Sequence, residues 1–515
     1  MPSTSTEGAG SEHPLVEDFT RPVEDYSAPT NGESPNGIPL HKRGDSKSQG
    51  VVRRRTTANS AGGPQSPRPP FSFRRVATTL LHPEKKIGQA PGVWRSIRSI
   101  ILASWLNLLL VFIPISWAFN FADKEQHTLI FVFSFLAIIP LAKLLAFATD
   151  ELSMRVGQTL AGLLNATLGN AVELIVAIIA LVKCQLHVVQ SSLIGSVLSN
   201  LLLVLGMCFF AGGVKYSEQG FGASATQLNS SLLTISVIAV LLPAAFRFSV
   251  TNETDPDSLN DILKVSHGVA LILLFIYASY LFFQLYSHAT LYANDSGDII
   301  KSTKYAPRDH KPKANATGTE TTTTAVPSDA EGSPQVEHEE EEEEEEEVPQ
   351  LSLYMTLGLL AVVTVVVAVT AEWLVDSIDG LVSTGSITKE FVGIILLPIV
   401  GNAAEHVTAV SVSVKDKLTL SLGVAVGSSI QIALFVIPFI VTLAWILGKP
   451  LTLLFDPYEA ISLFLAVITV NYVVQDGKSN WLEGMILMCL YLILATTFFF
   501  YPGTQNGFDL ICAQQ

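Results

Sequence analysis

Apolar residues dominate the chain after residue 97 and come in long runs separated by short polar breaks. A helix needs roughly 20 apolar residues to cross the hydrocarbon core of a bilayer. The pattern therefore predicts an all-α polytopic membrane protein with eleven transmembrane helices, grouped as one, five and five. We place these spans near residues 98–120, 127–148, 158–183, 190–213, 228–250, 264–287, 351–374, 387–413, 418–447, 453–474 and 481–501.

Polar segments divide the chain into six parts. Residues between His41 and Ser99 hold 13 Lys and Arg against two acids, which places the N-terminus in the cytosol. Ser, Pro, Gly and charge without a sustained apolar period favour disorder in the same region. The predicted parts are a disordered basic cytosolic tail (1–96), a first transmembrane helix (97–125), a five-helix repeat (126–287), an acidic cytosolic loop (288–350), a second five-helix repeat (351–502) and a short C-terminal tail (503–515).

The chain repeats itself at an offset of 232 positions. Residues 169–206 align with 401–438 without a gap, and 12 of the 38 pairs are identical. The best-matched stretch is Gly169-Asn170-Ala171-Val172-Glu173 against Gly401-Asn402-Ala403-Ala404-Glu405. Five predicted crossings separate the two glutamates, so the copies enter the membrane from opposite faces. This parity predicts two inverted-topology repeats, the architecture in which a central site opens alternately to each side.

Glu173 and Glu405 each lie inside an apolar span. A charged side chain at the bilayer centre costs at least ~2.5 kcal/mol on insertion scales. One charged residue inside an apolar span is hard to explain without a function, and two at equivalent positions are harder still. The pair therefore predicts an ion pathway.

Oxygen-bearing side chains surround both glutamates in the sequence. Asn170 and Asn402 stand three residues before them, on the same face if the helix is continuous. Gly169 and Gly401 allow close helix approach or expose a carbonyl. The following spans add Ser196, Ser199, Asn200, Ser428, Ser429 and Gln431. Such hard oxygen ligands suit Ca²⁺, although helix packing explains any single Gly or Ser equally well. The predicted cation set is Gly169, Asn170, Glu173, Ser196, Gly401, Asn402, Glu405, Ser428 and Gln431.

Five further titratable residues are candidates for proton handling or gating. His406 follows Glu405 directly and titrates near neutral pH, so it either packs between helices or relays protons. Glu372 and Asp376 end the seventh span, and Asp150 and Glu151 end the second. These four acids either mark the membrane interface or form an ion or proton vestibule, and both alternatives stay open.

The acidic loop carries most of the net charge. Residues 287–350 hold 16 acids against five bases, or −11 of the total −15. A segment this polar does not enter the bilayer, so we expect it to concentrate or sense Ca²⁺ in the cytosol, with a plain solvated linker as the alternative. Its candidate residues are Glu337, Glu339, Glu340, Glu341, Glu342, Glu343, Glu344, Glu345, Glu346 and Glu347.

Other functional classes find little support in the sequence. An intramembrane metallohydrolase would need an HExxH motif or clustered histidines, and the chain has neither, so we expect no enzyme activity. A passive channel is a further alternative, but its function does not require an inverted pair of ligands that bind protons. The four cysteines, Cys184, Cys208, Cys489 and Cys512, lack metal-ligand spacing and are predicted to be free thiols. No cofactor is expected beyond Ca²⁺ as the transported substrate.

Several motifs resemble those of one known family. The segment Leu397-Pro398-Ile399-Val400-Gly401-Asn402-Ala403-Ala404-Glu405-His406 is similar to the second signature of the cation/proton exchangers called CAX, within the calcium/cation antiporter superfamily. Residues 169–173 are similar to the first signature, and residues 241–246 and 476–484 are typical of the same family. The similarity covers about 97–502 and is greatest to fungal vacuolar Ca²⁺/H⁺ exchangers.

The resemblance implies a function. A vacuolar-membrane antiporter of this kind moves cytosolic Ca²⁺ into the vacuole in exchange for lumenal H⁺, with Glu173 and Glu405 as the ion-binding carboxylates. The acidic stretch between the repeats matches the family in place and charge. The expected partners are Ca²⁺, H⁺ and the lipid bilayer; no nucleic acid is expected, and a homo-oligomer stays open. A Mn²⁺/H⁺ or Na⁺-coupled cation antiporter is the alternative.

Overall fold

The computed structural model describes residues 88–250, 256–292, 299–305, 348–383, 385, 387–503 and 512. Nearly all of the predicted basic tail lies outside these residues. So do residues 306–347 of the acidic loop, which include Glu337 and the nine-glutamate run. The predictions made for those two segments therefore stay predictions.

The predicted first span, 98–120, is divided in the structure. Its first residues belong to a separate helix, α2 (Val93–Leu102). The segment long and apolar enough to cross a membrane is Trp105–Ala122, which consists of the 3₁₀ segment η1 (Trp105–Val111) and α3 (Phe112–Ala122). Ser104 caps η1, because its Oγ accepts a hydrogen bond from the backbone N–H of Leu106 at 3.2 Å. The Nδ2 of Asn107 donates to the Ile100 carbonyl at 2.8 Å and holds the break. Local polar side chains thus end a helix that the apolar run alone predicts to continue.

The first half of the chain follows with ten helices or helical segments. One continuous span, Leu186–Lys215, combines two α-helices around a π-helical turn, a local irregularity that often occurs at functional sites. The elements are α4 (His127–Ser153), α5 (Gln158–Leu168), α6 (Ala171–Val182), α7 (Leu186–Leu198), η2 (Ser199–Val204), α8 (Leu205–Lys215), α9 (Ala223–Val250), α10 (Pro256–Phe282), and the short η3 (Phe283–Ser287) and η4 (Ala289–Tyr292).

The second half has the same kind of irregular spans. A π-helical turn precedes the first turn of α13 and of α16, where a proline in each helix cannot donate a hydrogen bond to the preceding turn. The elements are α11 (Leu353–Ser383), α12 (Lys389–Phe391), η5 (Val392–Leu396), α13 (Leu397–Gly401), α14 (Ala403–Val414), α15 (Leu418–Gln431), η6 (Ile432–Val436), α16 (Ile437–Ile446), α17 (Pro457–Val473) and α18 (Trp481–Phe500).

Element bounds repeat at the offset found in the sequence. Both ends of α6 and α14 differ by 232 positions, as do the first residues of α7 and α15. The π-helical turns η2 and η6 end at equivalent positions, Val204 and Val436. The two copies therefore share a backbone path as well as a motif.

Eight helices in the described part of the chain are long and apolar enough to cross a membrane, or nine if the bent pair α12–α14 is one span. Helices α6 and α17 are shorter, so the predicted count of eleven is not confirmed. The direction of the repeats depends on fewer helices. Among the described residues, the four spans between α6 and α14 all pass the length and hydropathy test. An even number of intervening crossings gives α6 and α14 opposite directions.

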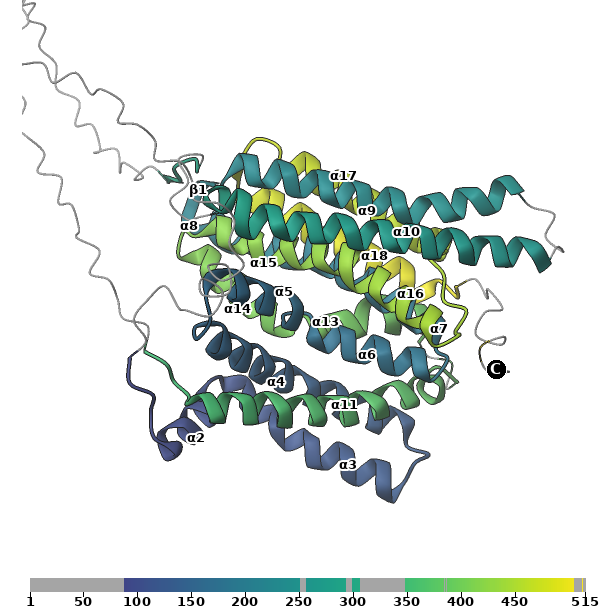
Figure 1. The fold of residues 1–515 in the computed structure, drawn as a ribbon, viewed down its shortest axis with the longest axis horizontal. Coiled ribbons are helices and arrows are strands. Elements are labelled where there is room, and N and C mark those ends of the chain that lie inside the picture. The colour runs from purple at the N-terminus through teal and green to yellow at the C-terminus, as the bar shows by residue number, and fades with distance from the viewer. Residues whose placement is uncertain are drawn as a thin grey trace, which may run out of the picture. The chain divides into compact units, whose positions relative to one another are not determined.

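Packing brings the two halves together. Figure 1 shows α4 and α11, which come from different repeats, running side by side with α3 against them. Helix α8 packs on α18, α10 on α16 and α9 on α17. Fully buried apolar side chains such as Leu201, Leu205 and Phe209 fill the centre of the Leu186–Lys215 span. The site described below lies where these helices converge.

A small antiparallel sheet links three polar connections. Strand β1 (Tyr216–Gly220) follows α8 and pairs with β2 (Thr303–Lys304) on one side and β3 (Lys478–Ser479) on the other. Strand β2 belongs to the predicted acidic loop. The beginning of that loop is therefore fixed to the helical body, even though residues 306–347 lie outside the described part.

One cysteine prediction is wrong. Cys184, between α6 and α7, forms a disulfide with Cys512, although 328 positions separate them. Their Cα atoms lie 5.6 Å apart, within the range that a disulfide bridges. Sequence spacing carries no information on a pair that only the tertiary fold brings together. Cys208 and Cys489 are free thiols, as predicted.

Candidate functional site

Both copies of the repeated motif interrupt a helix. Helix α5 ends at Leu168 and α6 begins at Ala171, while Asn402 separates α13 from α14 with a bend of 58° between the flanking segments. Asn170 (φ −101°, ψ 30°) and Asn402 (φ −84°, ψ 0°) lie near the bridge region between helix and strand. The predicted spans 158–183 and 387–413 are therefore each divided at the motif rather than continuous.

The break places each carboxylate at the start of a helix. Glu173 and Glu405 lie in the first turns of α6 and α14. Backbone N–H groups without intrahelical partners and the helix dipole make this end electropositive, which favours an anion there. Membrane transporters use such discontinuous helices to bind ions near the bilayer centre. The local backbone thus offsets part of the cost of burying two acids.

The two motifs contact each other through Gly401. A methyl group at Gly401 would overlap with the Glu173 carboxylate, because the Glu173 side chain lies on the Gly401 backbone. Glu173 is also near enough to Glu405 to repel it electrostatically. The acid of one repeat therefore meets the helix break of the other.

Hydrogen bonds cross between the repeats at the same place. The Nδ2 of Asn200 donates to the Ser428 Oγ at 3.0 Å, and that hydroxyl donates to the Asn170 Oδ1 at 2.8 Å. On the other side, the Asn402 Nδ2 donates to the Ser196 carbonyl at 3.4 Å. Each motif asparagine is thus held by a serine residue in the span that follows the other motif.

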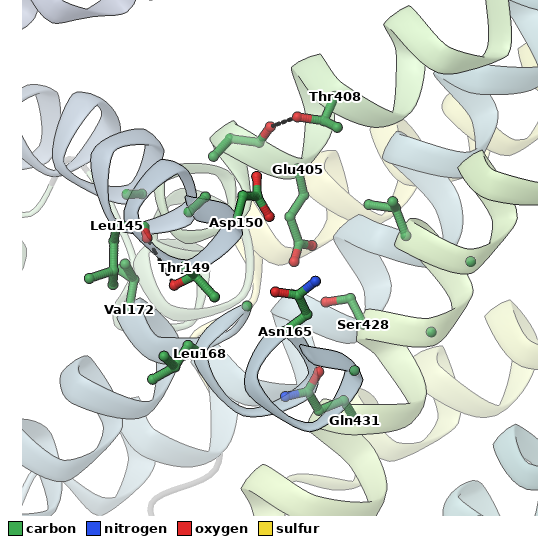
Figure 2. Close-up of a pocket in the computed structure, with 18 of the residues that line it drawn as sticks. Leu145, Thr149, Asp150, Asn165, Leu168, Val172, Glu405, Thr408, Ser428 and Gln431 are labelled. Atoms are coloured by element: carbon green, nitrogen blue, oxygen red, sulfur yellow. Dashed lines mark hydrogen bonds between the residues drawn. The ribbon is translucent and has the colours of Figure 1, made fainter. Parts of the chain in front are cut away.

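A cavity of about 400 Å³ opens beside Glu405. In Figure 2 the side chains of Asp150, Asn165, Glu405, Ser428 and Gln431 surround one space. Gly169, Gly401 and Gly427 contribute backbone to its wall. Glu173 does not line this space. It lies against a separate cavity of about 20 Å³, together with Ser196 and Gly401.

Several buried oxygen atoms near the motifs have no hydrogen-bond partner in the described part of the chain. They are Asn200 Oδ1, Asn402 Oδ1 and Glu405 Oε2. Buried polar atoms normally find a partner, so oxygens left without a donor suit a site that receives a cation or a proton. No group of three His, Cys, Asp or Glu residues within the described ranges is arranged to hold a metal. A cation here would therefore take its remaining ligands from amides, hydroxyls, carbonyls or water.

The acids at the ends of α4 and α11 have different environments. Asp150 faces the cavity beside Glu405 (Figure 2). Its neighbour Glu151 is buried and accepts hydrogen bonds from the backbone N–H groups of residues 350 and 351 at 3.0 and 3.1 Å. Glu372 and Asp376 are half-exposed and both bind Lys183 Nζ, at 3.0 and 3.1 Å. Of these four, only Asp150 lines the large cavity.

His406 lies apart from both cavities. Its Nε2 is 3.5 Å from the Ser199 Oγ, and the residue is absent from the walls of the two spaces that contain Glu173 and Glu405. The ring contacts the π-helical turn that begins at Ser199. Its role in proton handling stays a prediction.

Five polar residues of the cavity wall that carry an amide, an amine or an aliphatic hydroxyl were not predicted: Lys143, Thr149, Asn165, Gln284 and Thr408. Asn165 precedes Gly169 by one helical turn, and its carbonyl accepts the Gly169 N–H at 2.9 Å. The Lys143 Nζ donates to the Thr408 Oγ1 at 3.2 Å across the two repeats. A polar residue inside an apolar span is the available sequence signal for Lys143 and Asn165.

Comparisons with known proteins agree on one family. The family model described as sodium/calcium exchanger protein matches residues 126–286 and 355–500. The chain is 52% identical over 492 residues to the vacuolar calcium ion transporter of Cryptococcus neoformans var. grubii, covering 86% of this chain and 81% of that protein. It is 42% identical over 405 residues to the vacuolar calcium ion transporter of Schizosaccharomyces pombe, covering 79% and 87%. The crystal structure of the selenium-substituted Ca²⁺/H⁺ antiporter protein YfkE matches with a TM-score of 0.58 and 28% identity, over 78% of this chain and 100% of that chain.

Proposed function

This chain belongs to the sodium/calcium exchanger protein family, and from that premise we propose that it exchanges cytosolic Ca²⁺ for lumenal H⁺ across the vacuolar membrane. The two fungal relatives are vacuolar calcium ion transporters, and the solved relative is a Ca²⁺/H⁺ antiporter. The chain spans most of each of them. The relatives are transporters, which supports an ion antiporter and gives no support to an enzyme.

The observation that carries this proposal is the meeting of two carboxylates across two helix breaks. Glu173 and Glu405 lie close enough to repel, and Gly401 leaves room for the Glu173 carboxylate. A divalent cation between them neutralises both charges. Without the cation, repulsion and burial favour bound protons. Ca²⁺ and H⁺ thus compete for one site, and each leaves only when the other replaces it.

The remaining ligands are the buried oxygen atoms near the motifs that have no hydrogen-bond partner in the described part of the chain. Asn200 Oδ1, Asn402 Oδ1 and Glu405 Oε2 are the groups that we assign to the cation, with Ser428 holding Asn170 and Asn200 in place. Amide and carboxylate oxygens suit Ca²⁺, but they also accept Mn²⁺. Selectivity between these ions is therefore an outcome of the experiment below.

Access to the site differs between the two faces. The 400 Å³ cavity reaches Glu405 past Asp150, near the end of α4 that we place at the cytosol. On the opposite, lumenal face, Lys183 ties the end of α6 to Glu372 and Asp376 of α11. We therefore assign Asp150 to a cytosolic vestibule and the Lys183 contacts to lumenal closure. The N-terminus and the 288–350 loop are cytosolic in this orientation.

The deciding experiment is ⁴⁵Ca²⁺ uptake into sealed vesicles that contain the purified protein, with and without an imposed acid-inside pH gradient. Gradient-driven uptake that an H⁺ ionophore abolishes supports the proposal. Uptake that is independent of the gradient indicates a channel, and no uptake contradicts Ca²⁺ transport. Addition of Mn²⁺ or Na⁺ in excess shows which cation competes.

A further inference from the structure

A second group of buried acids lies away from the site described above. Glu390 of α12, and Asp456 and Glu459 at the start of α17, are exposed by only 3%, 1% and 1%. Glu390 precedes Gly401 by eleven residues of continuous helix, about 16 Å at 1.5 Å per residue. Three carboxyl groups from two helices therefore meet at the end of the bundle that also holds Cys184 and Lys389.

Two of the three acids have defined partners. Asp456 caps α17, since its Oδ1 accepts the Tyr458 N–H at 2.8 Å, and both its oxygens accept the Tyr501 hydroxyl at 3.0 and 3.1 Å. The Glu390 Oε1 lies 3.0 Å from the His187 Nε2 of α7. The helix N-terminus and the tyrosine thus stabilise one ionised carboxylate, and His187 stabilises another.

Glu459 has no such support. Neither of its carboxyl oxygens accepts a hydrogen bond from any donor in the described part of the chain, although the side chain is almost fully enclosed. Its electrostatic neighbours are Glu390 and Asp456, and the Glu390 carboxyl lies within hydrogen-bonding reach. Two ionised carboxylates can only accept hydrogen bonds. A bond between them exists only when one of them holds a proton.

Basic side chains also lie on the elements around the cluster. On α12, the Lys389 Nζ binds the Asp379 Oδ1 of α11 at 3.1 Å. On α9, which packs against α17, Arg247 is exposed near the end of the helix. Lys449 contacts the Cys184 sulfur. His187 contacts a member of the cluster directly, through the pair with Glu390.

The chain after α18 covers this cluster. Gly503, with φ +79°, lies directly on Glu390, so that a side chain at this position would overlap with the Oε1. Tyr501 closes the Asp456 side. Within the described residues, no group of three His, Cys, Asp or Glu side chains is arranged to hold a metal ion. The geometry therefore points to the smallest cation.

We propose that Glu390 and Glu459 share one proton and form a proton-binding site separate from the Glu173–Glu405 centre. The site faces the lumen, an assignment that rests on the orientation in the proposed function. In an acidic lumen the shared proton bridges α12 and α17. When the lumen approaches neutral pH, the proton leaves, and two buried anions then push the helices and the covering segment apart. Transport consequently depends on lumenal pH itself as well as on the gradient.

Infrared spectroscopy tests the proton directly and requires no transport. The purified full-length protein at mildly acidic pH, where the site holds its proton, should show a carbonyl band from a protonated carboxyl group that is lost in Glu459→Gln. Protons on Glu173 and Glu405 cancel in the difference between the two spectra. The matched control is Glu483→Gln, a half-buried acid in the first turn of α18. Identical carbonyl bands in wild type and Glu459→Gln would overturn the proposal.

Vesicle uptake tests the dependence on the lumen. Internal and external pH are raised together so that the gradient stays constant. Wild type and Glu483→Gln should lose initial rate severalfold as the lumen approaches neutrality, whereas Glu459→Gln should keep its rate. If the carbonyl band is lost but the two pH profiles coincide, the site holds a proton without sensing the lumen, and that part of the proposal falls. Should Glu459→Gln not fold, Glu459→Leu removes the same carboxyl group and serves in both measurements.

Discussion

The two copies of the repeated motif are nearly identical in sequence and differ in exposure. Glu405 lines a cavity of about 400 Å³ with Asp150 and Asn165. Glu173 is 8% exposed and lies against the Gly401 backbone beside a cavity of about 20 Å³. The bounds of α6 and α14, the helices that carry the two acids, correspond residue for residue. What differs is the packing of other helices around each copy.

This difference is the expected result of alternating access. Inverted repeats with equal conformations would leave the site equally open, or equally closed, to both faces. In this structure one repeat holds the wide arrangement and the other holds the closed one. Exchange of the two arrangements would move the opening to the other face, and the variants below are ordered by how strongly each should disturb that exchange.

The largest effect should follow removal of either carboxylate. Glu173→Gln and Glu405→Gln keep the side-chain volume but neither carry charge nor titrate, so gradient-driven ⁴⁵Ca²⁺ uptake should fall to background in each. The control is Glu218→Gln, an exposed acid of β1 that pairs with Lys478. Uptake near the wild-type rate in either motif variant, at normal protein level, would remove that residue from the site.

Two glycines of the same cavity wall provide the next comparison. A methyl group at Gly401 overlaps with the Glu173 carboxylate, whereas one at Gly427 meets nothing within 4 Å. Gly401→Ala should therefore lower the initial uptake rate at least about tenfold, equivalent to ~1.4 kcal/mol, and Gly427→Ala should leave it within about twofold. Equal rates in the two variants would show that the close contact between Gly401 and Glu173 is dispensable.

Substitution of the two adjacent acids at the end of α4 should affect different properties: one variant should change transport and the other stability. Asp150→Asn removes a charge from the cavity and should raise the Ca²⁺ concentration for half-maximal uptake a few-fold, with little change in thermal stability. Glu151→Gln should do the reverse, since one of two buried backbone N–H groups loses its acceptor at a cost of about 1–3 kcal/mol. The measurements are uptake kinetics and thermal unfolding in detergent. The reverse assignment of the two effects would place Glu151, rather than Asp150, in the ion path.

The smallest effect should come from Lys183. Its contacts with Glu372 and Asp376 are 36–49% exposed, and such surface pairs contribute about 0.2–1 kcal/mol. Lys183→Gln should thus change the uptake rate by less than about fivefold, and the difference from wild type should shrink at high salt because ions screen the pair. Complete loss of uptake would mean that Lys183 does more than hold the closed face.

The sequence predicted which candidate residues lie near one another better than it predicted their local backbone. The offset of 232 positions identified Glu173, Glu405, Asn170 and Asn402, and the structure brings all four together. It did not predict the helix breaks, because the apolar runs continue through both motifs. Tertiary hydrogen bonds hold those breaks, such as that from Ser428 to Asn170. Bonds between distant spans leave no periodic pattern.

Adjacent residues of one helix also take different roles in ways that the sequence does not show. Asp150 and Glu151 are neighbours, yet one faces the cavity and the other binds backbone N–H groups. Successive helical residues point about 100° apart, so the register of the last turn of α4 decides their roles. In the same way, the register of α14 turns His406 toward Ser199 and away from the cavity that Glu405 lines. The buried cluster around Glu459 gave no motif, because its members come from separate segments.

The disulfide between Cys184 and Cys512 closes a covalent ring that contains most of both repeats. A single cut anywhere in the 328-position interval opens the ring without dividing the protein into separate molecules. After cleavage of the loop between the repeats, the two fragments would migrate as one band in a non-reducing gel and part only when a reductant is added. Because the connecting loop is not the sole covalent link between the halves, it can be severed while the repeats stay joined.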